Sequence, residues 1–332
     1  MLSLGMAMTS MSASRAVAAP VPAGAVAFYD FLSGAQFGGT KTFTRASTAT
    51  YFDSALTLQV APINVPRITY ATVTGKVAGL WLETAVTNAI RNSSGAGAVA
   101  GSPGTLPDFT FNTTPANGIN RHVVGATTEA GMACYDIRFA GTASGASSHI
   151  LRFDYPSIAA AAAGQTWTNS LFHRVVAGSA TGTAFFLCPS ARSAADAGVD
   201  TQFAAFTPNT SALNTQRTSI TRTLVGATID RITSLLQLNV ADGATIDCTL
   251  RLAPQLEPAA AASSFIPTST ATVTRAADVL TLTPASGASL TWRALYNNDS
   301  TGTIATGITG AYVVDPATLA LPRVKMIWAA TS

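Results

Sequence analysis

The sequence is poor in charged residues, and this shortage already excludes some functions. Charged residues make up 11% of the 332 residues, whereas an average soluble domain has about a quarter. The three lysines are scattered singly, the other basic residues are isolated arginines, and the net charge is only +3. Nucleic-acid-binding proteins gather positive charge into a stripe or run. We therefore expect no nucleic-acid partner.

Cysteine and histidine are also scarce. The three cysteines, Cys134, Cys188 and Cys248, lie far apart and form no C-x-x-C pair. With only three histidines, a zinc site of the usual ligand spacing cannot be built. Each cysteine lies in an apolar run, where a free thiol behaves as a small buried hydrophobic group. We expect three buried thiols, no metal ligands among them, and assembly in a reducing cytoplasm.

Long apolar runs are missing as well. No uncharged stretch of 18 apolar residues appears, so we expect no insertion into a membrane. Residues 1–24 lack a basic first segment, and Ser, Thr and Gly interrupt their apolar residues. We expect a flexible N-terminal arm there. The small residues 16–18 would suit a signal-peptidase site, so a secretory signal is the alternative.

Signatures of catalysis are missing too. The sequence has no G-x-S-x-G motif, no P-loop and no dinucleotide fingerprint, and its histidines have no recognisable Ser or Cys context. A glycosidase needs two carboxylates about 5–10 Å apart, and sequence spacing does not show which carboxylates meet. We expect no enzymatic activity. The carboxylates considered are Asp53, Glu83, Asp136, Asp154, Asp247 and Glu257.

Strand patterns, in contrast, are abundant. In 245–257, every second residue from Ile246 to Leu252 is apolar, while Asp247, Thr249 and Arg251 would lie on the other face. Short strands without intervening helices predict an all-β, antiparallel β-sandwich. The strand-like stretches are 134–140, 149–155, 166–176, 183–188, 218–225, 232–240 and 245–257.

Two flanking stretches echo each other, because Thr-x-Thr-Arg-Ala occurs at 42–46 and again at 272–276. We expect two equivalent strands of one small sheet, with the central module inserted between them. Arg45 and Arg275 would make forked hydrogen bonds to carboxylates such as Asp53, Glu83 or Asp278. The expected parts are an arm at 1–24, a discontinuous β-rich base domain at 25–90 and 258–332, and a jelly-roll module at 91–257.

The flanking stretches resemble an ordered signature of phage and prophage fibre proteins. One departure is Ala55-Leu56, where such proteins usually have a glycine. The matching positions in the first stretch are Arg45, Ala46, Ser47, Tyr51, Asp53, Asn64, Arg67, Gly79, Leu80, Glu83, Thr87 and Asn88. Those in the second are Gln255, Leu256, Glu257, Ser263, Ser264, Ile266, Pro267, Thr268, Thr274, Arg275, Ala276, Ala277 and Asp278.

Residues 91–257 resemble the carbohydrate-binding jelly-roll module of phage and gene-transfer-agent head spikes. The resemblance implies a head-fibre or tail-fibre component of a virion that binds capsid or tail proteins and bacterial surface polysaccharide. It also implies a homo-oligomer, with a trimer as the first guess, and no cofactor. Jelly-roll sugar binders commonly hold a structural calcium, but no Asp-rich loop marks one here. The alternatives are a purely structural capsid decoration or adaptor protein and, third, a polysaccharide depolymerase.

A sugar site needs planar polar side chains for the hydroxyls and aromatic faces for the ring carbons. Trp167 and Tyr135 lie in alternating apolar frames, so we expect them in the core. If successive strands are adjacent, their polar faces would form one concave surface; a solvated or subunit-interface face is the alternative. The candidate ligand residues are Asp136, Arg138, Arg152, Asp154, His173 and Arg174.

Overall fold

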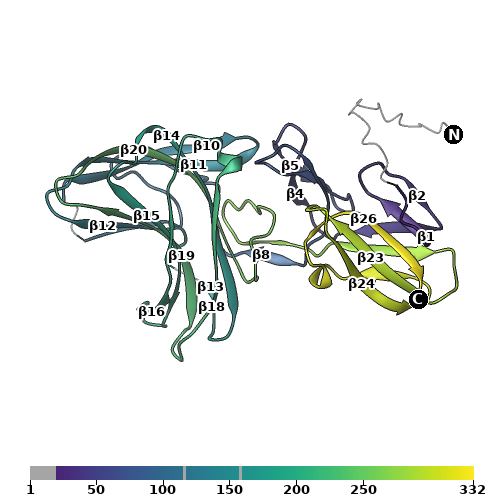
Figure 1. The fold of residues 1–332 in the computed structure, drawn as a ribbon. Coiled ribbons are helices and arrows are strands. Elements are labelled where there is room, and N and C mark those ends of the chain that lie inside the picture. The colour runs from purple at the N-terminus through teal and green to yellow at the C-terminus, as the bar shows by residue number, and fades with distance from the viewer. Residues whose placement is uncertain (1–19, 115–116, 157–158) are drawn as a thin grey trace, which may run out of the picture. The chain divides into compact units, whose positions relative to one another are not determined.

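The computed structural model describes residues 20–114, 117–156 and 159–332 (Figure 1). Within these ranges the chain forms β-strands and two 3₁₀ turns, η1 (Leu213–Thr215) and η2 (Pro316–Thr318), with no α-helix. The predicted all-β class is confirmed. Most of the predicted N-terminal arm, residues 1–19, lies outside the described residues.

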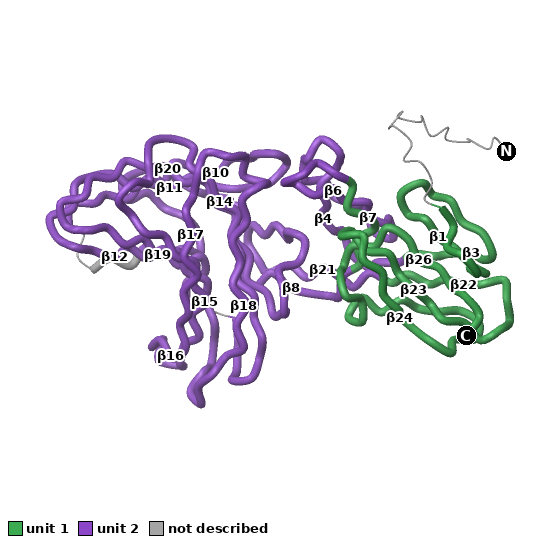
Figure 2. Tube along the Cα trace, viewed as in Figure 1, with its two compact units in different colours: residues 1–43, 77–82, 279–332 green, residues 44–76, 83–278 purple. Residues whose placement is uncertain are grey.

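The chain divides into two compact units (Figure 2). Unit 1 contains residues up to 43 together with 77–82 and 279–332, and unit 2 contains 44–76 and 83–278. Our sequence-based boundaries near 90 and 258 both fall inside unit 2. Segments 44–76 and 258–278 belong with the central module because Phe52 and Phe265 share a buried cluster with Phe172 of that module.

Unit 1 has two sheets around a stack of aromatic rings. The larger sheet has the order β2-β1-β26-β23-β24, with β7 paired to β26, and the smaller has the order β25-β22-β3. The Trp292 ring lies 6.3 Å from Tyr29 and 5.4 Å from Tyr312. The strands are β1 (Ala25–Asp30), β2 (Gln36–Phe37), β3 (Gly39–Thr44), β7 (Val77–Trp81), β22 (Val279–Pro284), β23 (Leu290–Tyr296), β24 (Thr301–Ile308), β25 (Tyr312–Val314) and β26 (Arg323–Thr331).

Unit 2 is built on a two-sheet sandwich. Sheet I has the order β10-β11-β20-β14-β18, and sheet II has the order β16-β15-β19-β12-β9 with β17 paired to β15 and β13 paired to β19. Sheet I comprises β10 (Ile119–Glu129), β11 (Met132–Thr142), β20 (Thr245–Glu257), β14 (Thr166–Ser179) and β18 (Arg217–Thr223). Sheet II comprises β16 (Gly198–Thr201), β15 (Thr183–Arg192), β19 (Arg231–Val240), β12 (Ser147–Arg152), β9 (Thr110–Thr114), β17 (Ala204–Phe206) and β13 (Ala159–Ala160).

The sandwich core follows the alternation read from the sequence. Ile246, Cys248, Leu250 and Leu252 all belong to one buried cluster between the sheets. Asp247 and its alternate neighbours on β20 face the other way, as expected for a strand with a period of two residues. Trp167 and Tyr135 also lie in the core, and the three cysteines are buried and free. These predictions are confirmed.

Strands from before and after the sandwich pair with one another. In unit 2, β8 (Val86–Asn88) pairs with β21 (Val273–Arg275), and in unit 1, β1 pairs with β26. The sandwich therefore lies, in sequence, between flanking strands that pair with one another. The echoing Thr-x-Thr-Arg stretches do not pair with each other, because β21 takes β8 as its partner. A hairpin of β4 (Ala49–Phe52) and β5 (Leu58–Ala61), followed by β6 (Ile68–Tyr70), completes unit 2.

Candidate functional site

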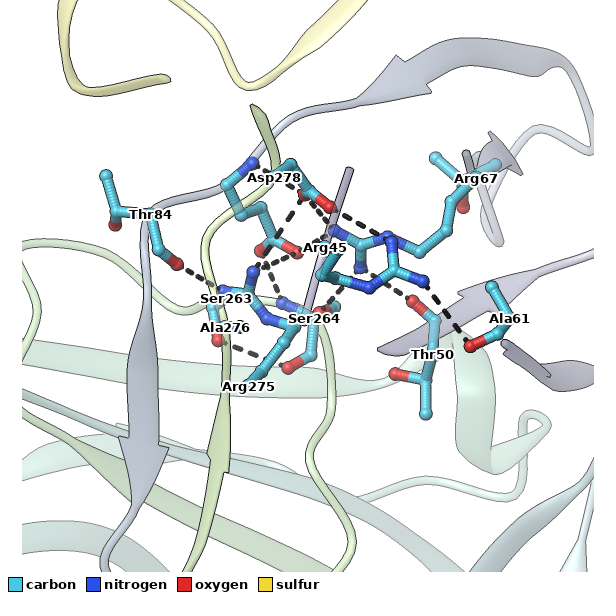
Figure 3. A network of polar contacts seen from close by, with 12 residues as sticks. Arg45, Thr50, Ala61, Arg67, Thr84, Ser263, Ser264, Arg275, Ala276 and Asp278 are labelled. Carbon is cyan, nitrogen blue, oxygen red and sulfur yellow. Dashed lines mark hydrogen bonds and ion pairs between the residues drawn. The ribbon is translucent and has the colours of Figure 1, made fainter. Parts of the chain in front are cut away.

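The longest sequence signature converges on a buried ion cluster in unit 2 (Figure 3). Arg45 Nη1 lies 3.0 Å from Asp278 Oδ1, and Arg67 Nη2 lies 2.5 Å from Asp278 Oδ2 and 2.9 Å from Glu83 Oε2. Arg275 Nη1 lies 3.5 Å from Glu83 Oε2. All five side chains are buried. Arg45 and Arg275 thus face carboxylates as predicted, but the predicted forked hydrogen bonds are not formed, because each arginine approaches through one nitrogen.

The cluster is electrically balanced once Glu257 is included. Glu257 is fully buried, acts electrostatically on Arg275, and accepts hydrogen bonds from the backbone N–H and hydroxyl of Ser263 at 2.9 and 2.5 Å. Burial by itself would raise the pKa of Glu83, but Arg275 and Arg67 outweigh it and hold that pKa below its usual value. Three guanidinium groups thus face three carboxylates, which is how buried charge is tolerated.

Other signature residues hold the same segments together by polar side chains. Ser47 Oγ accepts from the N–H of Ala276 at 2.9 Å, and Asn88 Nδ2 donates to the carbonyl of Ile266 at 2.8 Å. Asp53 is not part of the cluster, because it accepts from Gln59 Nε2 at 2.8 Å. These signature residues therefore make contacts within the chain.

The turn that follows Asp53 contains the Ala55-Leu56 departure from the signature described above. Leu56 adopts a left-handed conformation with φ +59°. A non-glycine residue in that conformation costs about 1–2 kcal/mol. Three hydrogen bonds at the turn, two to Asp53 Oδ1 and one to the Asp53 carbonyl, offset this cost.

Three of the predicted ligand residues lie on the outer face of sheet I, where other charges already bind them. Both oxygens of Asp136 accept from Arg251, at 2.9 and 2.8 Å. Arg138 makes the same forked contact with Asp247 at 2.7 and 2.8 Å. Arg174 Nη1 donates to Glu129 Oε1 at 2.7 Å, and the other Glu129 oxygen accepts from Arg251 at 2.7 Å. Charge on this face is cancelled within the chain.

The other three predicted residues lie elsewhere. His173 points into the sandwich, where its ring lies 4.4 Å from Phe206 of sheet II and burial lowers its pKa to about 4. Arg152 belongs to sheet II and pairs with Asp196 at 2.8 Å. Asp154 follows β12 and pairs with Arg91 at 2.7 Å. The six residues therefore do not share one surface, because β11 and β12 are consecutive in sequence but belong to different sheets.

The outer face of sheet II has a different chemistry. Leu236, Leu238 and Val240 of β19 point into the core, so Gln237 and Asn239 lie on the outer face. Asn239 is registered with Ser148 of β12 and Ala184 of β15. Gln237 is registered with Ile150 and Phe186 in the next row. We call this outer face, around Ser148, Gln237, Asn239 and Phe186, the amide face.

A shallow hollow of about 660 Å³ opens on the amide face. Small side chains keep it open where β12, β15 and β19 meet their loops. At its side, the ring of Phe186 meets that of Phe203 edge-on at 6.0 Å, and Phe203 is 50% exposed. The lining residues are Ala146, Ser147, Ser148, Gly182, Thr183, Ala184, Gln237, Asn239, Val240 and Ala241.

The amide face was not predicted, although the sequence contains a pattern that indicates it. In LLQLNV (235–240), two amide side chains alternate with the core positions. Amides are weaker signals than arginines and carboxylates, since they are equally common on solvated faces. Only the strand order shows that Ser148 and Ala184 flank them.

Four carboxylates of the sandwich have lowered pKa values, which bears on catalysis. Burial would raise the pKa of Glu129, Asp196 and Asp200, but hydrogen bonds from arginines and backbone N–H groups outweigh it and lower all three pKa values. The forked bond from Arg138 lowers the pKa of Asp247. A glycosidase acid requires the opposite, a raised pKa.

No group of three or more His, Cys, Asp or Glu side chains in the described ranges is arranged to hold a metal ion. No helix in the described part of the chain is long and apolar enough to span a bilayer.

Comparisons with known proteins return distant structural likenesses. No protein-family model matches the chain, and no curated protein matches it. The enzymatically active domain of tailspike protein 4 from bacteriophage CBA120 is similar at 10% identity and TM-score 0.35 over 51% of this chain, which spans only 21% of that domain. A family 11 carbohydrate-binding module of a Clostridium thermocellum cellulase is similar at 9% identity and TM-score 0.29, covering 52% of this chain and 99% of the module.

A third similar structure is described as a carbohydrate-binding module of the β-sandwich superfamily. It is 19% identical with a TM-score of 0.35, covering 69% of this chain and 84% of the other. All three TM-scores lie below 0.5. The strand order and core described above therefore carry the assignment of this chain as an all-β protein with an inserted two-sheet sandwich.

Proposed function

We propose that the chain is a non-enzymatic polysaccharide-binding protein and that the amide face is its binding surface. The observation that carries this proposal is the pair of outward amides, Gln237 and Asn239, beside a hollow of about 660 Å³. Amides and hydroxyls can both donate and accept hydrogen bonds, as sugar hydroxyls do. An open, shallow hollow suits a polymer lying along the surface. The rings of Phe186 and Phe203 offer apolar faces for sugar carbons.

Filling the hollow tests this proposal. Ala184 is exposed in the lining, so Ala184→Trp should block the surface without disturbing the core. Ala126→Trp, at an exposed position of sheet I, is the matched control. We expect purified protein and the control to be retarded in gels containing bacterial envelope polysaccharide, and Ala184→Trp to migrate freely. Free migration of all three proteins in every polymer would contradict the proposal.

The absence of catalysis is part of the proposal and has its own test. It is supported by the lowered pKa values of Glu129, Asp196 and Asp200, which do not suit a general acid. We expect no new reducing ends when the protein is incubated with a polymer that it retains. Their appearance would favour the depolymerase alternative.

We further propose that the chain is a fibre or spike component of a phage-like particle, assembled in a bacterial cytoplasm, which brings the particle to bacterial surface polysaccharide. The resemblance of 43–93 and 253–279 to phage fibre proteins supports this role. Particles labelled with an antibody against the chain test it. Labelling at the head or tail is expected, whereas a sandwich buried against a neighbouring capsid protein would favour a decoration or adaptor role.

Self-association is proposed on the basis of the sheet edges in unit 1. Among the strands that the structure describes, β24 pairs only with β23, and it contains neither proline nor a charged residue. Such edges tend to pair with another chain. Light scattering should give a homo-oligomer, with a trimer as the first expectation, and a monomer at micromolar concentration would contradict it.

A further inference from the structure

The amide face differs from the rest of the sandwich in having no charged residue in the lining of its hollow. Arginines of the same sheet lie several residues away along the strands. Arg152 is registered with Leu235, four residues before Asn239, a separation of about 13 Å along a strand. Arg152 and Arg192 share Asp196, at 2.8 and 2.6 Å.

The polar groups of the hollow are arranged as donors and acceptors. Asn239 Oδ1 accepts from Ser148 Oγ at 2.9 Å and from Gln237 Nε2 at 2.9 Å. This leaves Asn239 Nδ2 as a donor and Gln237 Oε1 as an acceptor, and the described part of the chain provides no partner for either atom. Both side chains are half-buried, so their free atoms lie at the surface beside the hollow.

This arrangement distinguishes between classes of polysaccharide. A carboxylate or sulfate on a ligand requires a cation or several N–H donors in place of its hydration shell. Here it would meet one amide N–H pair, the oxygen of Gln237, and a turn carrying the exposed Asp242 beside the lining residue Ala241. A sugar hydroxyl pair, in contrast, can accept from Asn239 and donate to Gln237.

We infer that the hollow of the amide face binds an uncharged, hydroxyl-rich polysaccharide and discriminates against acidic ones. The inference rests on the proposed polysaccharide-binding function. Asn239 supplies the donor, Gln237 supplies the acceptor, and Ser148 fixes the orientation of Asn239. Because no ion pair with the ligand is involved, binding is insensitive to salt.

Affinity electrophoresis with matched polymers tests the inference. The full chain is run in gels containing dextran, hydroxyethyl cellulose or galactomannan, and in gels containing the carboxymethylated form of each polymer. We expect retardation by at least one neutral polymer, at least fivefold weaker retardation by its carboxymethylated form, and less than a twofold change between 50 and 500 mM NaCl. Asn239→Ala should weaken retardation about fivefold, since one hydrogen bond contributes about 1 kcal/mol.

Control variants separate the two possible failures. Asn120→Ala, an exposed asparagine of sheet I, should leave retardation unchanged, and the melting temperatures of both asparagine variants should match that of the parent. Stronger retardation by the carboxymethylated polymers that Ala184→Trp abolishes would overturn the neutral-ligand inference and keep the proposed function. Retardation that Ala184→Trp does not affect would overturn the binding surface, and no retardation by any polymer would overturn both.

Discussion

The ion cluster and the amide face both belong to unit 2, and they use polar side chains in opposite ways. In the ion cluster, Arg45, Arg67 and Arg275 are buried against carboxylates, and nearly every polar contact is made within the chain. On the amide face, uncharged side chains lie at the surface with hydrogen-bonding atoms left over. The residues that stand out in the sequence hold the protein together, while the residues suited to a ligand are inconspicuous.

The two regions differ because burying a charged side chain costs more free energy than leaving an amide at the surface. A buried charge must be paired, so it fixes the positions of several segments at once. An exposed amide has little effect on folding and keeps its hydrogen-bonding capacity for a partner. Substitutions in the cluster should therefore change stability, and substitutions on the amide face should change binding alone.

Removal of Asp278 should have the largest effect. Asp278 Oδ1 and Oδ2 contact Arg45 and Arg67, and Oδ2 also accepts from the backbone N–H of Glu83 at 2.9 Å. Asp278→Ala removes the carboxylate that Arg45 and Arg67 share, so the buried cluster keeps three guanidinium groups but loses one negative charge. We expect a loss of about 3–5 kcal/mol in the free energy of unfolding, measured by urea denaturation.

The matched control is Asp247→Ala, which removes a carboxylate that makes a forked bond to Arg138 on the exposed surface. Water replaces that contact, so the urea midpoint should hardly change. Equal losses in the free energy of unfolding would show that the buried cluster contributes no more to stability than an exposed ion pair does.

His173 should give the next largest effect, through pH. Its neighbours in the sandwich, the Thr218 hydroxyl at 2.9 Å and the Phe206 ring, carry no charge, and burial lowers its pKa from 6.5 to about 4. The unfolded chain therefore takes up this proton first, and stability falls as the pH drops from 6.5 to 4. The expected loss is ~3 kcal/mol.

The pH dependence can be assigned by substitution. In His173→Gln the unfolding free energy should fall less steeply between pH 6.5 and 5 than in the parent protein, and the slope that remains is assigned to His149, whose pKa burial also lowers. If the free energy of unfolding of the parent protein stays constant over this range, the proposed lowering of the His173 pKa is wrong. The sandwich interior would then hold a protonated His173 without an ionic partner.

Below pH 4.5, Glu83 should determine much of the pH dependence of the free energy of unfolding, with a smaller effect than that of His173. Arg275 and Arg67 outweigh the effect of burial and hold the pKa of Glu83 below 4.5. Its contribution is present above that pH and is lost as the pH falls through the folded-state pKa. In Glu83→Gln the free energy of unfolding should be lower at neutral pH and should fall less steeply below pH 4.5. An unchanged slope would assign the acid sensitivity to other carboxylates.

The sequence predicted most of the fold, because strands with one buried face show a period of two residues. The β20 alternation was readable in this way, whereas the carboxylate partner of Arg45 was inferred from the repeated Thr-x-Thr-Arg-Ala stretch. The units were harder to predict: segments 44–76 and 258–278 join each other through side chains such as Arg67 and Asp278, and they join the sandwich through buried rings such as that of Phe172, all of them distant in the sequence.

The predicted site failed for two separate physical reasons. His173 and Arg174 are neighbours in one strand, and neighbouring side chains point to opposite faces, so the sequence already contained this contradiction. Asp136 and Arg152 were placed together because their strands are consecutive, but the chain crosses from sheet I to sheet II between them. Strand order in a sandwich is set by the packing of both sheets, which the sequence of one strand does not show.

The smallest predicted effect concerns the aromatic edge of the amide face. Phe203 is half exposed and meets Phe186 edge-on, so Phe203→Ala removes little buried surface and should leave the melting temperature nearly unchanged. If the ring packs against the sugar carbons of a retained polymer, its loss should weaken retardation about threefold, since an aromatic contact contributes about 0.5–1.5 kcal/mol. Val225→Ala, an exposed apolar position following sheet I, provides the control for general surface effects. If Val225→Ala weakens retardation more than Phe203→Ala does, the Phe186 and Phe203 rings do not contact the polymer. The recognition surface then consists of the amides and the hollow alone.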